Sequence, residues 1–450
     1  MDTFDHSGAA QLAATANEPG WLNPLRSAAR DHWLRSTLPH AKTESWRHTS
    51  IAALSQADYL RFGHDAGLDA SAAHEAEQEL AALSERVALE GLSGPRLVFV
   101  NGEYHAALST APANAAHAGL TRFRDADDHQ QMLIKQHLGQ VAAPDHVFAT
   151  LNSSWLDDGV LYHLNQPDQA TEPLHIVHLT RPLEHAFTAR QRLLVVVEPH
   201  CQGTVIEHFD SNAGQQNCFV NGVSEFVVNE GAQLTHYRLH LEEEHSIHIG
   251  GAYAHLQRDA RLDSFCLALG GQLKRLDLRV AHQGAGSECN INGVYLSKGK
   301  QHVDLHATIE HEAAHGTTAE VFRGIIDDQA RAVFNGRIHI HPQAQKTLAE
   351  LSNRNLLLSN QAELYTKPEL EIYADDVRCA HGATVAQIDE QALYYLQSRG
   401  IDRKEAQVML SFGFINELLD QLPHEPVRQR LRPVLSNWFG KDSRLTRHIL

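Results

Sequence analysis

Short apolar runs separated by polar turns fill the chain from residue 174 to about residue 377. Examples are residues 193–197 (LLVVV), 226–228 (FVV) and 276–280 (LDLRV). The runs recur about every 8–14 residues, a spacing typical of the strands of sandwiches, barrels and solenoids. The pattern therefore predicts a mainly β core over residues 174–378.

The distribution of proline narrows the choice among these folds. No proline occurs between His200 and His341. Proline cannot donate a hydrogen bond to a sheet, so its absence fits strands that are paired on both sides. Few two-residue hairpin loops are present, which favours a parallel β-solenoid whose stacked rungs bury one continuous core. A sandwich or barrel is the alternative.

Helical patterns flank this core. Apolar residues recur at three- and four-residue steps from Trp21 to about Leu89. Asp389 and Asp402 are suited to cap two C-terminal helices, and Gly400 to end the first of them. We therefore predict a disordered segment 1–20, an N-terminal helical domain 21–95, a mixed α/β segment 96–173, the β core 174–378 and a C-terminal helical domain 379–450.

The second C-terminal helix is apolar around most of its circumference, which exceeds what one core-facing side requires. We interpret part of this surface as an interface for another protein and assign to it Met409, Phe412, Phe414 and Ile415. The alternative is that both sides of the helix dock within this chain.

Composition excludes several classes of protein. Acidic residues outnumber basic ones by 55 to 38, and the net charge of −17 argues against nucleic acid or an anionic membrane as partner. No apolar run reaches the roughly 18 residues of a membrane span, and the N-terminus lacks the features of a signal peptide. The five cysteines are widely spaced without a CxxC pair. They predict reduced thiols and a cytoplasmic protein.

Cys379 and His381 form the most informative pair in the chain. In extended backbone, residues i and i+2 face the same side, so a thiol and an imidazole, both metal ligands, share one space. An iron–sulfur cluster needs four ligands, usually thiolates. This chain offers two at this point, so a partner chain would have to supply the others. The alternative is that the pair only fills space at the boundary between strands and helices.

Two enzyme classes, a zinc protease and a β-helix enzyme, are alternatives for the function. Residues 311–315 (HEAAH) match the zinc-protease pattern H-E-x-x-H, but in a strand residues i and i+4 lie roughly 13 Å apart, too far for one metal. A β-helix enzyme acting on polysaccharide would instead carry a row of carboxylates along one face. No phosphate-binding glycine loop and no G-x-S-x-G motif occur. We therefore expect a protein that binds no nucleotide and is not an enzyme.

Longer motifs carry a family resemblance. Residues 373–385 (YADDVRCAHGATV) and 394–401 (YYLQSRGI), together with 333–336 (VFNG), 367–372 (KPELEI) and 44–49 (ESWRHT), closely resemble the SufB/SufD family of the SUF iron–sulfur cluster assembly system. The likeness covers most of the chain from about residue 20. The segment around Cys379 resembles the SufD members. Residues 351–357 lack the essential strand cysteine of the SufB members.

The resemblance implies a right-handed parallel β-helix flanked by helical domains. It implies a scaffold subunit without ATPase activity, which pairs through its last strands with SufB and through its C-terminal helices with the ATPase SufC. A transient iron–sulfur cluster or iron would be shared with SufB. His381 would contact it as a ligand, and Cys379 as a supporting ligand or interface thiol. A homodimer could replace the SufB pairing in the isolated chain.

Overall fold

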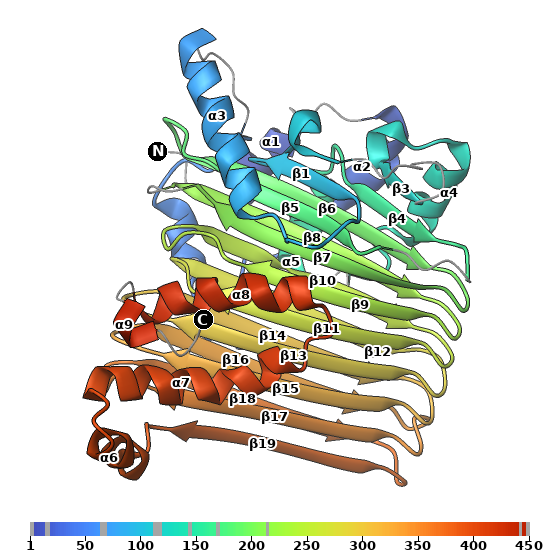
Figure 1. Ribbon diagram of the computed structural model, residues 1–450. Coiled ribbons are helices and arrows are strands. Elements are labelled where there is room, and N and C mark those ends of the chain that lie inside the picture. The colour runs from blue at the N-terminus through green and yellow to red at the C-terminus, as the bar shows by residue number, and fades with distance from the viewer. Residues whose placement is uncertain are drawn as a thin grey trace.

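The computed structural model describes residues 4–13, 19–63, 70–110, 119–142, 146–167, 172–212, 216–440 and 443–446. Its central feature is a tall stack of strands that form two sheets (Figure 1). The chain alternates between the two sheets, and almost every pairing within them is parallel. The predicted parallel β-solenoid is confirmed, and the sandwich and barrel alternatives do not apply.

One sheet has ten strands and the other nine. The ten-stranded sheet runs in the order β19 (Arg378–Ala386), β17 (Leu348–Leu357), β15 (Thr317–Ile326), β13 (Glu288–Ser297), β11 (Arg261–Leu269), β9 (Gln233–His240), β7 (Gln202–Ser211), β5 (Leu174–Thr180), β1 (Arg96–Val100) and β2 (Glu103–Tyr104). The nine-stranded sheet runs in the order β18 (Glu363–Ile372), β16 (Arg331–Ile340), β14 (His302–His311), β12 (Leu273–His282), β10 (Ile247–Leu256), β8 (Cys218–Val228), β6 (Phe187–Val197), β4 (Val160–Leu164) and β3 (Leu120–Arg122).

The space between the two sheets is the main core. In the nine-stranded sheet, Leu276, Leu305 and Phe334 occupy one register position on successive strands, and all three are fully buried. Side chains alternate between the two faces of a strand, so every second residue of each rung enters this core. The stacking of rungs thus builds one continuous apolar interior.

Helices cover the outer faces of both sheets. The helices α7 (Arg403–Asp420) and α8 (Glu425–Phe439) lie across the ten-stranded sheet (Figure 1), where Ile415 and Leu431 pack with Phe265 and Leu296. The first rungs of the nine-stranded sheet are covered by α1 (His6–Ala13), α2 (Asn23–Arg35), α4 (Asp128–His137) and α5 (Val147–Ser154). The helix α3 (Ala70–Arg86) packs on the first strands of the ten-stranded sheet, and α9 (Ser443–Thr446) lies against α7.

The prediction of disorder for residues 1–20 is wrong for residues 4–13, which form an ordered turn and α1. Phe4 and Ala9 are buried, and the Trp155 indole donates a hydrogen bond to the Ala9 carbonyl at 2.8 Å. A helix rich in small residues can approach another element closely, which composition alone does not reveal. Residues 1–3 and 14–18 of that predicted segment lie outside the described residues.

The strands also extend further than predicted. The predicted C-terminal helical domain begins at residue 379, but β19 continues to Ala386 and the next helix, α6 (Glu390–Ser398), begins after the Asp389 cap. The predicted caps at Asp389 and Asp402 are confirmed, as is the end of α6 at Gly400, whose φ is +85°. Within the described residues, no helix is both long and apolar enough to span a membrane.

Candidate functional site

Cys379 and His381 lie on β19, the last strand of the ten-stranded sheet. In the parallel register Cys379 pairs with Ala349 and His381 with Leu351, and both partners are buried in the solenoid interior. Residues in register on neighbouring strands face the same side of a sheet. The two side chains therefore both face the inner side at the open end of the solenoid, as the i, i+2 spacing predicts.

Their exposure differs. The Cys379 side chain is half-buried against the interior core, whereas His381 is exposed. Burial raises the pKa of the Cys379 thiol, which favours its protonated form at neutral pH. The described residues contain two groups of three or more potential metal ligands. Neither group includes Cys379 or His381. The two side chains therefore do not form a complete metal site among the described residues.

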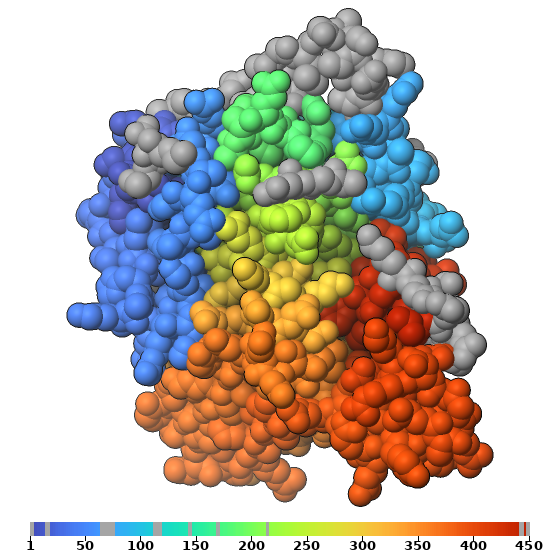
Figure 2. All heavy atoms as spheres, turned by 90° about the vertical axis from the view of Figure 1, so that its left-hand side faces the viewer, coloured from blue at the N-terminus to red at the C-terminus, as the bar shows by residue number. Residues whose placement is uncertain are grey.

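The surroundings of the pair are also exposed. β18 and β19 lie at the ends of their sheets, and each has one hydrogen-bonded neighbour. Figure 2 shows the orange atoms of the last rungs at one end of the molecule, beside the orange-red C-terminal helices. Large apolar side chains are exposed there, among them Ile372, Tyr373 and Val385. An unpaired strand with an apolar border is a template for pairing with another chain.

The HEAAH segment does not assemble a zinc site. His311 ends β14 and faces inward, where it stacks on His282 at 4.2 Å and lies 3.0 Å from the Thr318 hydroxyl. His315 lies in the following turn with a φ of +62°. Because the segment is a strand end and a turn, the two histidines do not share a helical face. The metalloprotease hypothesis therefore has no site here.

The prediction of a partner interface on α7 is wrong for two of its four residues. Phe412 and Ile415 are buried in this chain's own core, against the outer face of the ten-stranded sheet. Phe414 is half-buried there, with the Arg323 guanidinium 5.4 Å from its ring centroid. Met409 is half-buried. The largest exposed apolar groups of the C-terminal region lie instead on α6, at Tyr394 and Tyr395, which are 75% and 57% exposed.

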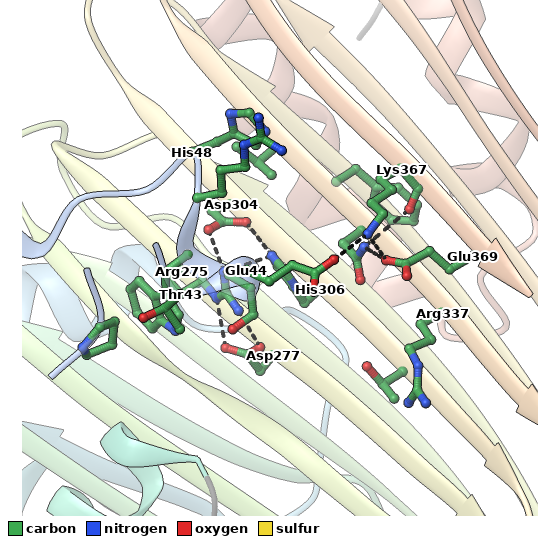
Figure 3. A pocket seen from close by; sticks show the side chains of 18 of the residues that line it. Thr43, Glu44, His48, Arg275, Asp277, Asp304, His306, Arg337, Lys367 and Glu369 are labelled. Carbon is green, nitrogen blue, oxygen red and sulfur yellow. Dashed lines mark hydrogen bonds and ion pairs between the residues drawn. The ribbon is translucent and has the colours of Figure 1, made fainter. Parts of the chain in front are cut away.

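A cleft of about 940 Å³ lies on the outer face of the nine-stranded sheet, beneath residues 37–48 (Figure 3). At its centre Arg275 donates to Asp277 at 3.0 Å and to Asp304 at 2.6 Å. Burial would raise the pKa values of these two carboxyls, but the Arg275 charge outweighs it and holds both below their ordinary values. At the far side Lys367 pairs with Glu44 and Glu369.

These pairings bear on the polysaccharide hypothesis. A glycosidase needs a carboxylic acid that remains protonated near neutral pH beside a second carboxylate. In this cleft Asp277, Asp304 and Glu369 are each held by a cationic side chain. The row of carboxylates exists, but its charges are already neutralised, which argues against acid catalysis.

Sequence reasoning missed the charged groups inside the solenoid. Arg238 and His236 on β9 lie 2.8 and 2.9 Å from Glu207 on β7, and all three are buried. Glu242 is likewise buried against Lys274 at 2.8 Å. The sequence contains a signal of these buried charges. The alternate positions of β9 that face inward with Leu234 are occupied by polar residues.

Comparisons with known proteins agree with this architecture. The SUF system FeS cluster assembly, SufBD core domain matches residues 181–414, and the SufBD protein N-terminal region matches residues 7–176. The chain is 31% identical to a SufBD family iron–sulfur cluster assembly protein of Synechocystis, over 95% of this chain and 93% of that one.

Two relatives carry the SufD name. The chain is 31% identical to the iron–sulfur cluster assembly protein SufD of Escherichia coli, over 88% of each chain. It is 26% identical to SufD of Bacillus subtilis over 69% of this chain and 71% of that one. With its matching fold and its two family domains, this chain belongs to the SufBD family of the SUF iron–sulfur cluster assembly system.

Proposed function

We propose that this chain is a scaffold subunit of a SUF complex, without catalytic turnover of its own, which pairs with SufB and binds the ATPase SufC. The observation that carries the proposal is the position of Cys379 and His381 on an edge strand, facing inward at the open end of the solenoid. A nascent cluster or iron would be held there between the two chains. Its remaining ligands would come from SufB.

The edges of the two sheets support the pairing. β18 and β19 present backbone groups on the side away from β16 and β17, and a strand from another chain can satisfy them. Exposed Tyr373 and Val385 border this surface and would be buried by a partner. In the absence of SufB a second copy of this chain could cover the same end, which would give a homodimer.

The cysteine chemistry also supports this role. The half-buried Cys379 thiol has a raised pKa, so it binds iron by releasing a proton and stays unreactive otherwise. His381 offers an exposed imidazole next to it. All five cysteines are unpaired, in keeping with the reducing cytoplasm that we propose as the location.

We place the SufC contact on the C-terminal helices. Tyr394 and Tyr395 on α6 are exposed, and α6 contacts α7, which carries the half-buried Met409. Aromatic side chains of this kind are enriched in protein interfaces. ATP would be bound and hydrolysed by SufC, and this chain would transmit the resulting movement to the SufB edge.

The ligand role is tested by co-expression of this chain with SufB and SufC. His381→Ala should lower the iron content of a complex that still contains all three subunits. His245→Ala is the matched control, since His245 is also exposed but pairs with Glu243 in a turn far along the chain. Iron and acid-labile sulfide per complex are the measurement. Equal iron in the His381 and His245 variants would refute the ligand role.

A further inference from the structure

A second group of potential metal ligands lies away from Cys379 and His381. Glu310 on β14, His339 on β16 and His341 just after β16 bring one carboxylate oxygen and two imidazole nitrogens within 4.8 Å of one another. Glu310 Oε2 lies 2.6 Å from His339 Nδ1 and 3.2 Å from His341 Nε2. We call these three residues the outer triad.

The two oxygens of the Glu310 carboxylate have different partners. Arg337 donates to Oε1 at 2.9 Å, and the Arg279 guanidinium lies 3.7 Å from the same atom. Both histidines contact only Oε2. Arg337 is itself held by two hydrogen bonds to Glu371, each 2.9 Å long. The arginines therefore fix the orientation of the carboxylate and leave its other oxygen directed at the imidazoles.

This geometry is close to that of a mononuclear metal site. Bond lengths of about 2.1 Å to a tetrahedral zinc place neighbouring donor atoms about 3.4 Å apart. The two measured contacts of Glu310 Oε2 are within an ångström of that separation.

A chemically similar group elsewhere in the chain shows what distinguishes the outer triad. His240, Glu242 and His248 also place two imidazoles on one carboxylate, but they are buried inside the solenoid. There the Lys274 ammonium lies 2.8 Å from Glu242 Oε2 and already occupies the place of a cation. In the outer triad Arg337 and Arg279 lie at Oε1, the oxygen that does not contact the imidazoles. His339 and His341 are 18% and 32% exposed, so an ion can enter from solvent.

We propose that Glu310, His339 and His341 bind a divalent transition-metal ion, either Zn²⁺ or Fe²⁺. Two imidazoles and one carboxylate are a donor set that both ions accept, with the remaining positions open to water. The neighbouring arginines partly offset the charge of the carboxylate and occupy Oε1, so we expect weaker binding than at a site without them. The site shares no residue with the Cys379–His381 pair and does not depend on the function proposed above.

The test uses the full chain, freed of metal and titrated with Co²⁺ as a spectroscopic probe, then with Zn²⁺ in competition. We expect one equivalent to bind and to give the absorption bands of Co²⁺ in a low-symmetry nitrogen and oxygen site. His341→Ala and Glu310→Gln should each weaken binding more than tenfold. Anaerobic dialysis against Fe²⁺ with metal analysis extends the measurement to iron.

His245→Ala is the control, because His245 lies 2.9 Å from Glu243 and is 46% exposed without a third ligand. It should bind the probe as the wild type does. His341→Ala removes a half-exposed side chain, so its thermal unfolding should match that of the wild type and separate loss of a ligand from loss of fold. Wild-type affinity in His341→Ala, or loss of binding only in His381→Ala, would overturn the proposal.

Discussion

The first and last rungs of the solenoid are built from the same repeat but differ in exposure. Every residue of β6 and β8 is buried, whereas β18 and β19 are largely exposed or half-buried. The first end is closed within the chain by the antiparallel strands β2 and β3 and by helices such as α1 and α5. At the last end the sheets stop at β18 and β19, in which no residue is fully buried. One repeat thus forms a covered end and an end with exposed edge strands.

The earlier and later rungs also differ in how their buried carboxylates are neutralised. In the earlier rungs the buried carboxylates of Glu207 and Glu242 are neutralised by Arg238 and Lys274. Further along, Glu320 on β15 is buried inside, and neither of its oxygens has a hydrogen-bond partner in the described part of the chain. Burial raises the pKa of this carboxyl to about 8. Glu320 is in register with Leu351, which is in register with His381, so this protonated group lies two strands from the open end.

The largest expected effect is the loss of a paired charge in the early rungs. Arg238→Met leaves the buried Glu207 carboxylate without its cation, which costs about 3–5 kcal/mol of unfolding free energy. Urea unfolding followed by circular dichroism measures this. Arg331→Met is the control, since Arg331 and Glu363 form a half-exposed pair worth at most about 1 kcal/mol. Equal losses in the two variants would contradict the proposed difference between interior and surface.

A pH-dependent effect of comparable size is expected at Glu320. Its pKa is raised in the folded state, so the folded chain keeps a proton that the unfolded chain has already lost. The stability contributed by this proton is complete below the ordinary carboxyl pKa and is lost as pH rises towards about 8, by about 1.4 kcal/mol per pH unit. Glu320→Gln should therefore gain stability relative to wild type between pH 5 and pH 8.

The control for this comparison is Glu350→Gln, on the exposed side of the neighbouring strand. Its unfolding free energy should follow the wild-type pH dependence. If the unfolding free energy of Glu320→Gln also follows the wild-type pH dependence, then the Glu320 carboxyl has a charge partner or water that lowers its pKa. The buried carboxylates of the later rungs would then be as well neutralised as those of the earlier rungs.

The smallest effect on stability is expected at the open end. Val385 is 51% exposed, so Val385→Asp should change the unfolding free energy by no more than about 0.5 kcal/mol. Leu305→Ala, at a fully buried position, should cost about 2–5 kcal/mol. Co-purification with SufB should show the opposite order, with the Val385 variant recovering less partner. Unchanged recovery would place the SufB contact elsewhere.

Several features of this fold were already determined by local sequence. The absence of proline from His200 to His341 marks strands with neighbours on both sides, and Pro368 lies in β18, at the edge of its sheet. The Asn101–Gly102 pair, a common hairpin sequence, forms a hairpin turn with φ values of +49° and +90°. The i, i+2 spacing of Cys379 and His381 put both on one face. Each of these depends on backbone geometry within a few residues, which sequence specifies directly.

Other features depended on which strands pair with one another, and only the tertiary structure decided this pairing. Partners in register lie at unequal separations along the chain, as Ile247 with Leu273 and Arg331 with Glu363 show, so no fixed repeat reveals the pairing. The outer triad and the isolation of Glu320 arise from that pairing. Apolarity predicted that Phe412 and Ile415 would be covered, but the sheet of their own chain covers them. Hydrophobic burial is non-directional, so sequence indicates that a surface will be buried while packing selects its partner.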